Sequence, residues 1–439
     1  MNKVCVAGLW HLGLVSAATL AELGFRVTGF EADTPKIENL RQGKLPLYEP
    51  GLEELVSAHL KKSSLQFEDD PVRAVSQAQV VLITFDTPVD DEDRVDLSEL
   101  DSTITLITPH LDKNAVVIIH SQVPVGTSER WQVEIDTKRP GASIDVVCSP
   151  ENLRLGCALE LYKKPDMIVV GSDSERARKK AATFFAFFDA QKIYVSRRTA
   201  EMAKHALNVF FATSISFANQ LGNLCDQVGA DGMEIARILK ADGRIGKRAQ
   251  VRPGLGFAGA TLARDLRALQ RLGHEVGEPT PLIDAVLDIN QRQTERVVRL
   301  IAQYFEGDMR GKVVTVLGLT YKPGTSTLRR SAALEIIQKL QNLGAEVRAH
   351  DPKADIGEYS GKVPFEFIRD PYEAVAGAHA ILLTTEWPEY RDLDFAKIRE
   401  RMSGAVILDA KNHLDAKKIR EKGFVYLELG RGQLAGEKV

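Results

Sequence analysis

The stretch VCVAGLWHLG at residues 4–13 decides which fold the sequence predicts. It joins a short apolar run, rich in β-branched residues, to a turn that contains glycine. Apolar residues at helical spacing follow from 14 to 23, and a second strand-like run covers 26–30. A strand, a glycine turn, a helix and a second strand in this order are typical of a doubly wound parallel sheet.

The same alternation continues along the chain and then restarts after an interruption. Further strand-like runs lie at 80–84, 116–120, 144–148 and 167–171, and again at 313–318, 346–350, 380–384 and 406–409. Between the two groups, residues 199–229 have a helical pattern without a strong breaker. We therefore predict an α/β protein in which two doubly wound, Rossmann-like domains, 1–196 and 309–439, are joined by a helical central domain, 197–308, with a long spine helix.

Composition narrows the class of protein further. The 439 residues are 44% hydrophobic and 27% charged, which is ordinary for a water-soluble protein of two or three domains. A net charge of −3 gives no reason to expect nucleic acid or an anionic membrane as a partner. The four cysteines, Cys5, Cys148, Cys157 and Cys225, form no CxxC pair, so we expect no metal site and predict reduced thiols in a cytoplasmic protein.

The first turn is an altered dinucleotide fingerprint of the form G-x-G-x-x-G. Gly8 and Gly13 are kept, but Trp10 stands at the second glycine, where the pyrophosphate normally approaches the helix N-terminus. Glu31, at the end of the second strand, suits a ribose diol, and no arginine follows it directly, which favours NAD over NADP. The motif alone leaves open a domain without cofactor, because the indole must turn aside or block the site.

Short motifs in collinear order run through almost the whole chain. They are YEPGL at 48–52, TP at 87–88, VPVGT at 123–127, SPENL at 149–153, AEMAK at 200–204, RIG at 244–246, RPG at 252–254, RDL at 264–266, YKP at 321–323, TEW at 385–387 and DAK at 409–411. Together they resemble the motifs of the UDP-glucose/GDP-mannose dehydrogenase family, and those of its UDP-glucose branch most closely. That family oxidises a primary alcohol of a nucleotide sugar to a carboxylate with two molecules of NAD, through a thioester on a cysteine.

The resemblance implies NAD as the cofactor, a UDP-sugar as the substrate, a homodimer or a higher homo-oligomer, and a set of site residues. Those implied to bind the cofactor are Gly8, Trp10, His11, Leu12, Gly13, Glu31, Thr87, Pro88 and Gln122. Those implied to bind the substrate are Glu151, Asn152, Leu153, Lys204, Asn208, Arg244, Gly256, Phe257, Gly259, Lys322, Arg329 and Lys411.

Catalytic roles follow from the same resemblance. Lys204 would stabilise a developing oxyanion, and Asn208 would hold a substrate oxygen or a water. Asp265 would orient water or tune Lys204, and Glu151 would serve as an acid or base. From the residues alone, Lys204 and Asn208 share a helix face at i and i+4, while the two carboxylates would be read as ordinary surface groups.

The sequence departs from the family pattern where the chemistry occurs. Thr261 stands at the position of the cysteine, and a threonine hydroxyl is a poor nucleophile unless Lys204 acts as its base. Gln122 replaces a threonine, and Lys411 replaces an arginine, which keeps the charge but loses the bidentate fork. Cys157 is expected on a helix facing the core, where it could not substitute for the missing thiol.

Three functional interpretations therefore stay open. The first is a dehydrogenase that completes both oxidation steps without the cysteine. The second is a two-electron or redox-neutral, epimerase-like enzyme acting on a UDP-sugar. The third is a catalytically inactive homologue that binds UDP-sugars.

Overall fold

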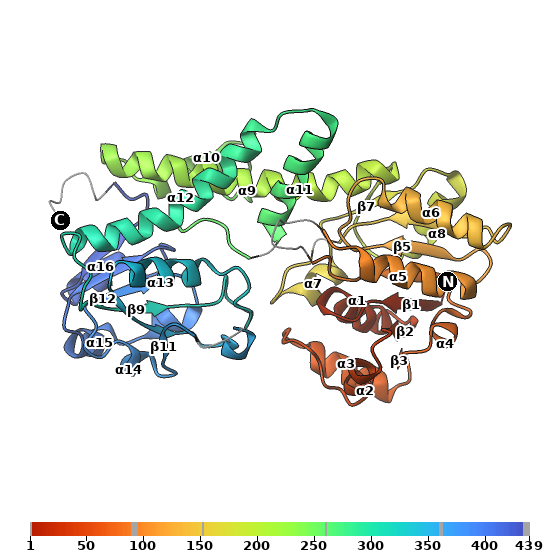
Figure 1. Cartoon of the computed structure of the whole chain (residues 1–439), viewed down its shortest axis with the longest axis horizontal. Coiled ribbons are helices and arrows are strands. Elements are labelled where there is room, and N and C mark those ends of the chain that lie inside the picture. The colour runs from red at the N-terminus through yellow and green to blue at the C-terminus, as the bar shows by residue number, and fades with distance from the viewer. Residues whose placement is uncertain (1, 89–94, 152, 260, 360–362, 433–439) are drawn as a thin grey trace. The chain divides into compact units, whose positions relative to one another are not determined.

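The computed structural model describes residues 2–88, 95–151, 153–259, 261–359 and 363–432 (Figure 1). The chain divides into two compact units, Met1–Leu207 and Asn208–Val439. Within the described ranges, no helix has both the length and the apolar character needed to cross a bilayer.

The first unit is built on an eight-stranded sheet with the strand order β3-β2-β1-β4-β5-β6-β7-β8. Its strands are β1 (Lys3–Ala7), β2 (Arg26–Phe30), β3 (Leu65–Glu68), β4 (Val80–Ile83), β5 (Val116–Ile119), β6 (Asp145–Cys148), β7 (Met167–Gly171) and β8 (Gln191–Val195). The order reverses between β1 and β4, which is the topological switch point where doubly wound sheets bind ligands.

One strand pair departs from the parallel sheet that the sequence predicts. β6 and β7 are antiparallel and meet at Cys148 and Gly171, whereas every other neighbouring pair is parallel. Among the described residues between them, the only helix is the short α7 (Ala158–Lys163), and an antiparallel neighbour needs no crossover helix. The prediction of a wholly parallel first sheet is therefore wrong at this pair.

Helices cover both faces of the first sheet. They are α1 (His11–Glu22), α2 (Thr34–Arg41), α3 (Leu52–Lys61), α4 (Pro71–Val75), α5 (Ser98–Ile107), α6 (Thr127–Lys138), α7 and α8 (Glu175–Phe185). Strands β4, β5 and β6 are buried along their whole length, as expected for a sheet covered on both sides. Two separate apolar clusters result, one containing Leu14 and Phe184 and the other containing Trp131.

The second unit combines long helices with a six-stranded parallel sheet of order β11-β10-β9-β12-β13-β14. The strands are β9 (Val313–Leu317), β10 (Glu346–His350), β11 (Glu366–Phe367), β12 (Ala380–Leu383), β13 (Val406–Asp409) and β14 (Val425–Glu428). The helices are α10 (Gly232–Ala241), α11 (Thr261–Val276), α12 (Pro281–Tyr304), α13 (Ala332–Asn342), α14 (Pro371–Ala374), α15 (Phe395–Arg401) and α16 (Ala416–Glu421). Two doubly wound sheets with helices between them in the sequence are thus confirmed.

The predicted spine helix is α9 (Arg197–Val228), which is 32 residues long and extends from the first unit into the second (Figure 1). Asp226, near its C-terminal end, is fully buried. Its carboxylate accepts hydrogen bonds from the Arg296 guanidinium of α12 at 2.8 Å and from the backbone N–H groups of Gly430 and Gly432 at 3.0 Å each. Asp226 therefore ties the segment after β14 to the helices of the second unit.

Replacing this carboxylate should destabilise the second unit strongly. The substitution Asp226→Ala leaves a buried guanidinium without its counter-charge, a loss that costs about 3–5 kcal/mol in comparable proteins. We expect a lower urea midpoint and faster hydrogen exchange at Gly430 and Gly432. The control is Asp308→Ala, because the Asp308–Arg310 pair lies at the surface. Equal effects of the two substitutions would contradict the role assigned to Asp226.

Candidate active site

The turn between β1 and α1 requires two glycines but not three. Gly8 has a φ of +97°, and a Cβ at Gly13 would lie 1.8 Å from the Gly8 carbonyl oxygen. Trp10 has a φ of −92°, so the backbone there accepts any residue, and its indole is 42% exposed. Among the described residues no side chain caps the N-terminus of α1, whose N–H groups therefore suit a pyrophosphate. The backbone conformation of this turn therefore tolerates the tryptophan without strain.

Glu31 lies where the fingerprint needs an acid, directly after β2. It is 4% exposed, and its Oε2 accepts hydrogen bonds from the Leu9 N–H at 3.1 Å and from the Lys36 ammonium at 2.7 Å. A carboxylate has about four lone-pair positions, so Glu31 retains capacity for a ribose diol.

The second sheet has an acid at the matching place, Asp351 after β10, but its carboxylate is saturated. Its Oδ2 accepts from the backbone N–H groups of Leu319 and Thr320, the Thr320 hydroxyl and the Trp387 indole. Its Oδ1 accepts from the N–H groups of Lys353 and Ala354. Because these donors occupy every lone pair, the second sheet cannot read a ribose diol in this way, and the first sheet is the one that fits the dinucleotide.

Residues predicted to surround the nicotinamide lie on loops that follow β4 and β5. Thr87 is buried and Pro88 exposed after β4, and Gln122 is half-buried after β5. The loop after β5 is held to α9 by Glu201, whose buried carboxylate accepts from the Gly126 N–H at 2.6 Å and the Ser128 N–H at 2.8 Å. The structure thus brings these residues and the β1 turn to the carboxyl edge of one sheet.

Two of the candidate catalytic residues, Lys204 and Asp265, are more buried than the sequence alone suggests. Lys204 is 9% exposed on the same helix as Glu201. Asp265 is fully buried on α11 and accepts a hydrogen bond from the Asn208 amide, so it is not an ordinary surface carboxylate. Thr261 is the exposed first residue of α11, one helical turn before Asp265.

The segment after β6 is only partly described. Glu151 and Leu153 are half-buried, and Asn152 lies outside the described residues. The Glu151 N–H donates to the His120 carbonyl at 3.3 Å, and burial lowers the pKa of the His120 imidazole. Glu151 therefore lies next to a buried, uncharged histidine.

The cysteines differ from the prediction at one position. Cys157 is exposed and precedes the first residue of α7, so the expected core-facing position is wrong. The reason is that Glu49 binds the N–H groups of Gly156 and Ala158 and starts the helix only after Cys157. Cys5, Cys148 and Cys225 are buried, and burial raises the pKa of Cys5 to about 12. A buried thiol in such surroundings is not a nucleophile.

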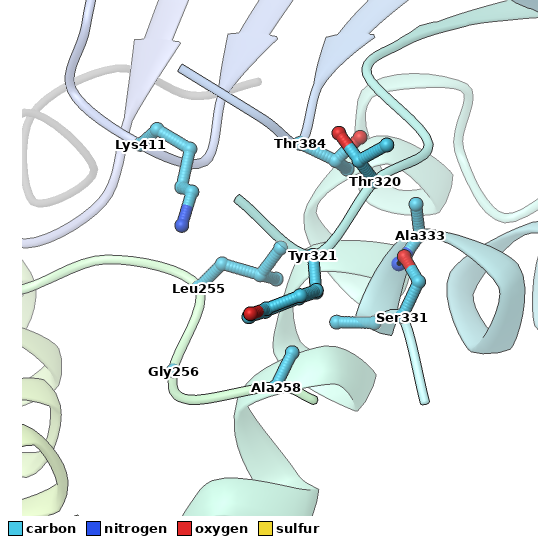
Figure 2. A pocket seen from close by; sticks show the side chains of 10 residues that line it. Leu255, Gly256, Ala258, Thr320, Tyr321, Ser331, Ala333, Thr384 and Lys411 are labelled. Atoms are coloured by element: carbon cyan, nitrogen blue, oxygen red, sulfur yellow. Dashed lines mark hydrogen bonds between the residues drawn. The ribbon is translucent and has the colours of Figure 1, made fainter. Parts of the chain in front are cut away.

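A small hollow lies at the carboxyl edge of the second sheet (Figure 2). Its lining residues are Leu255, Gly256, Ala258, Thr320, Tyr321, Ser331, Ala332, Ala333, Thr384 and Lys411. Lys411 reaches toward the hollow from beyond β13, opposite the N-terminus of α13 (Figure 2). Its ammonium lies 3.1 Å from Glu386. Burial raises the pKa of Glu386, but the charge of Lys411 and the hydrogen bonds to the carboxylate together lower it below its ordinary value. The N-terminus of α13 is capped by the Ser331 hydroxyl, which accepts a hydrogen bond from the Ala333 N–H at 3.2 Å, so Lys411 is the feature of the hollow that suits a phosphate group.

The glycine-rich loop beside this hollow is held rigidly. Asn290 accepts from the Phe257 N–H at 2.8 Å and donates to the Phe257 carbonyl at 2.9 Å. Gly256 and Gly259 have φ of +98° and +81°, and a Cβ at either would approach Asn290 or Tyr321 within 3.0 Å. Larger residues at these two positions would therefore distort the loop.

Four of the five basic residues predicted to bind substrate, Lys204 among them, do not line the hollow. Arg244 is exposed and forms an ion pair with Asp242 at 2.6 Å. Arg329 is exposed, and the Lys322 ammonium lies 5.7 Å from the centre of the Tyr321 ring. Only Lys411 of the predicted basic residues borders the hollow itself.

Sequence reasoning missed the role of Glu49 in the YEPGL motif. This buried carboxylate accepts from His11 Nε2 at 2.9 Å and from the Gly156 and Ala158 N–H groups at 2.8 Å each. It therefore joins the first residue of α1 to the start of α7. Burial raises the pKa of Glu49, but these hydrogen bonds outweigh it and leave the pKa below its ordinary value of 4.5.

The stability contributed by Glu49 should depend on pH. Because its pKa is lower in the folded chain than in the unfolded one, the contribution is complete above about pH 4.5 and is lost as the pH falls through the folded value. We expect Glu49→Gln to lower the unfolding midpoint at neutral pH and to flatten its decline in acid. The exposed neighbour Glu53→Gln is the control. An unchanged acid profile in Glu49→Gln would contradict this assignment.

Matches to known proteins cover almost the whole chain, and they agree on one family. Models of the UDP-glucose/GDP-mannose dehydrogenase family match residues 2–189 as the NAD binding domain, 198–292 as the central domain and 315–416 as the UDP binding domain. The UDP-glucose 6-dehydrogenase of Rhizobium meliloti is 34% identical over 98% of this chain and 99% of its own. TuaD, the UDP-glucose 6-dehydrogenase of Bacillus subtilis, is 34% identical over 99% of this chain and 95% of its own.

Solved structures lead to the same family. A UDP-glucose dehydrogenase from Pyrobaculum islandicum superposes with a TM-score of 0.89 at 32% identity, covering 98% of each chain. A UDP-D-ManNAc dehydrogenase from Pyrococcus horikoshii superposes with a TM-score of 0.85 at 26% identity, covering 98% of this chain and 99% of its own. The chain therefore belongs to the UDP-glucose/GDP-mannose dehydrogenase family, with NAD as that family's cofactor.

Proposed function

We propose that this chain removes one hydride from a CH–OH group of a UDP-sugar, with NAD as the oxidant, and releases the carbonyl product. Membership of the family supports the cofactor and the substrate class. The observation that carries the departure from the family's four-electron reaction is Thr261, an exposed hydroxyl at the start of α11 where the family has its cysteine.

The chemical reason is the difference between a hydroxyl and a thiolate. The first oxidation converts CH–OH and NAD⁺ into a carbonyl, NADH and a proton, and it needs no covalent bond to the protein. The second oxidation in the family proceeds from a thiohemiacetal, which a thiol forms readily because a useful fraction of it is ionised near neutrality. A threonine hydroxyl is scarcely ionised at that pH, so the reaction would stop after the first step.

The remaining site residues support the first step. Bound NAD supplies the hydride acceptor, held by the β1 turn and Glu31. Lys204 would stabilise negative charge on the reacting oxygen, and Glu151 would take the proton. The amide nitrogen of Asn208 is committed to Asp265, which leaves its oxygen to accept a hydrogen bond from a sugar hydroxyl or a water.

The substrate's diphosphate would bind at the hollow of the second unit. Lys411 is the candidate contact that borders the hollow, and Arg244, Lys322 and Arg329 are further candidate contacts. We assign the cofactor to segment 1–196, subunit contact to 197–308 and the nucleotide to 309–439. Reduced cysteines support a cytoplasmic location.

The stoichiometry of the reaction tests this proposal directly. Incubation with NAD and UDP-glucose should give one NADH per sugar converted, and the product mass should be two hydrogens lower. Replacing the hydroxyl by a thiol in Thr261→Cys should raise the yield to two NADH per sugar and give the uronate. Absorbance at the NADH band and mass spectrometry of the sugar measure both.

The matched control is Thr261→Ser, which keeps a hydroxyl and should leave one NADH per sugar. Two NADH and a uronate from the unmodified chain would show that both oxidations proceed without the cysteine and would end the proposal. UDP-sugar binding without any NADH would instead favour a redox-neutral enzyme or a binding protein.

We also propose that the chain forms at least a homodimer through α9. Phe210, Phe217 and Leu224 follow one another at seven-residue intervals on this helix and are 75%, 49% and 59% exposed. Val228, one turn beyond Leu224, is 76% exposed. A heptad-spaced apolar stripe on a long helix is the pattern that packs against a second helix.

A single charge in this stripe should therefore separate the subunits. In light scattering coupled to gel filtration, we expect twice the mass of one chain or more, falling to one chain in Phe210→Glu. Val276→Glu is the control, because Val276 is 67% exposed at the end of α11. A monomeric unmodified chain at micromolar concentration would contradict the dimer.

A further inference from the structure

A buried histidine directly after β5 joins the end of β4 to the segment that follows β6. The backbone N–H of His120 donates to the Ile83 carbonyl at 2.9 Å, and its carbonyl accepts from the Glu151 N–H at 3.3 Å. Its imidazole Nδ1 is hydrogen-bonded to the Ser149 carbonyl. His120 therefore holds the chain on both sides of Pro150.

The surroundings of the imidazole determine how it is protonated. The Ser149 carbonyl can only accept, so Nδ1 of His120 carries a hydrogen and donates it. Nε2 is buried and has no hydrogen-bond partner among the described residues, and the rings of Tyr162 and Phe185 pack edge-on against the imidazole. Burial lowers the pKa of His120, although the charge of Glu151 acts in the opposite direction. The ring is therefore neutral, and its one N–H is directed at Ser149.

The proline explains why the segment after β6 needs a side chain to hold it. The Ser149 N–H still continues the ladder between β5 and β6, through a bond to the Ile119 carbonyl at 2.9 Å. Pro150 has no N–H, so the next backbone donor is that of Glu151. Ser149 is 3% exposed, and the imidazole is the donor that satisfies its buried carbonyl.

The segment matters for function because it carries Glu151. Under the proposed function this carboxylate takes the proton of the sugar hydroxyl, and a base must lie within hydrogen-bond reach of the proton that it removes. The side chain of Glu151 has further interactions of its own. Loss of the imidazole should therefore displace the carboxylate from its working position without releasing it completely.

We infer that His120 is the positioning residue for Glu151, and that it acts through the hydrogen bond from its Nδ1–H to the Ser149 carbonyl. This inference rests on the proposed function, which assigns Glu151 its role. His120 is 3% exposed, so its influence on the reaction passes through the backbone of the segment.

Three substitutions of His120 separate this hydrogen bond from the packing of the ring. In His120→Asn, the amide nitrogen can take the place of Nδ1 and donate to Ser149. In His120→Gln, the longer side chain carries its amide past that place. In His120→Leu, the side chain has no donor. The backbone bonds to Ile83 and Glu151 do not involve the side chain and remain available in all three variants.

The first readout does not require activity. Hydrogen exchange of the full chain without ligands, followed by mass spectrometry, reports on the Glu151 N–H. Exchange at this amide should be faster in His120→Gln and His120→Leu than in the unmodified chain, and His120→Asn should restore most of the protection.

The second readout is the rate of hydride transfer in a single turnover, with NAD and UDP-glucose both saturating. His120→Gln and His120→Leu should lower this rate by about ten- to hundred-fold, because a base displaced by a fraction of its bonding distance loses that much. Calorimetry should show unchanged affinities for NAD and for UDP-glucose. His120→Asn should restore most of the rate.

The possible results separate this inference from the proposed function. A purely structural role would lower the unfolding temperature of His120→Gln and His120→Leu but leave the single-turnover rate unchanged, and this result would overturn the inference. A His120→Asn variant as slow as His120→Gln would also overturn it, and this comparison holds even if His120→Leu does not fold. An unmodified chain that forms no NADH would overturn the proposed function and the role of Glu151 with it.

Discussion

Two buried carboxylates hold the long helix α9, one in each of the two units. Most of the site depends on the contacts that these two carboxylates make. Glu201 accepts two backbone N–H groups at the start of α6, and Asp226 accepts two from the segment after β14 together with the guanidinium of Arg296. Charged hydrogen bonds in a buried setting are strong when complete and costly when broken. Lys204, His205 and Asn208 lie between these anchors on the same helix.

The two sheets have a similar strand order, but the acids that follow their second strands differ. What differs is the number of hydrogen bonds that each carboxylate already accepts. Glu31 and Asp351 occupy matching positions after the second strand of each sheet. Asp351 is saturated by backbone, hydroxyl and indole donors, so it stabilises the turn after β9. Glu31 retains acceptor capacity beside an uncapped helix N-terminus. Under the proposed function, the same fold serves once for a dinucleotide and once for a phosphate-bearing ligand.

The residues at which the sequence departs from the resemblance differ in their surroundings. Gln122 is bound by His205, so it is part of a packed site. Trp10 is 42% exposed, and it is the neighbouring His11 that is bound by Glu49. Thr261 is exposed at a helix start. Under the proposed function, Thr261 is the residue that changes the reaction.

The sequence by itself determined the fold class, the family, the long helix and most strands to within a residue or two at their ends. Buried parallel strands are continuous apolar runs, so a short window of the sequence is enough to identify them. It did not reveal β8, whose residues are mostly exposed, or β11, which is two residues long. It also missed the four-residue strands β3 and β14, which lie outside the predicted runs. Among site residues, Gly8, Gly13 and Glu31 were predictable, because their role depends on the backbone of one turn and one strand end.

Only the tertiary structure decided which side chains become partners across long sequence distances. Glu49 binds Gly156, His205 binds Gln122, and Asp265 is buried against Asn208. It also reversed the expectation for Cys157 and made the β6–β7 pair antiparallel. The physical reason is that a hydrogen bond depends on distance in space, whereas periodicity in the sequence reports only which face of an element is apolar.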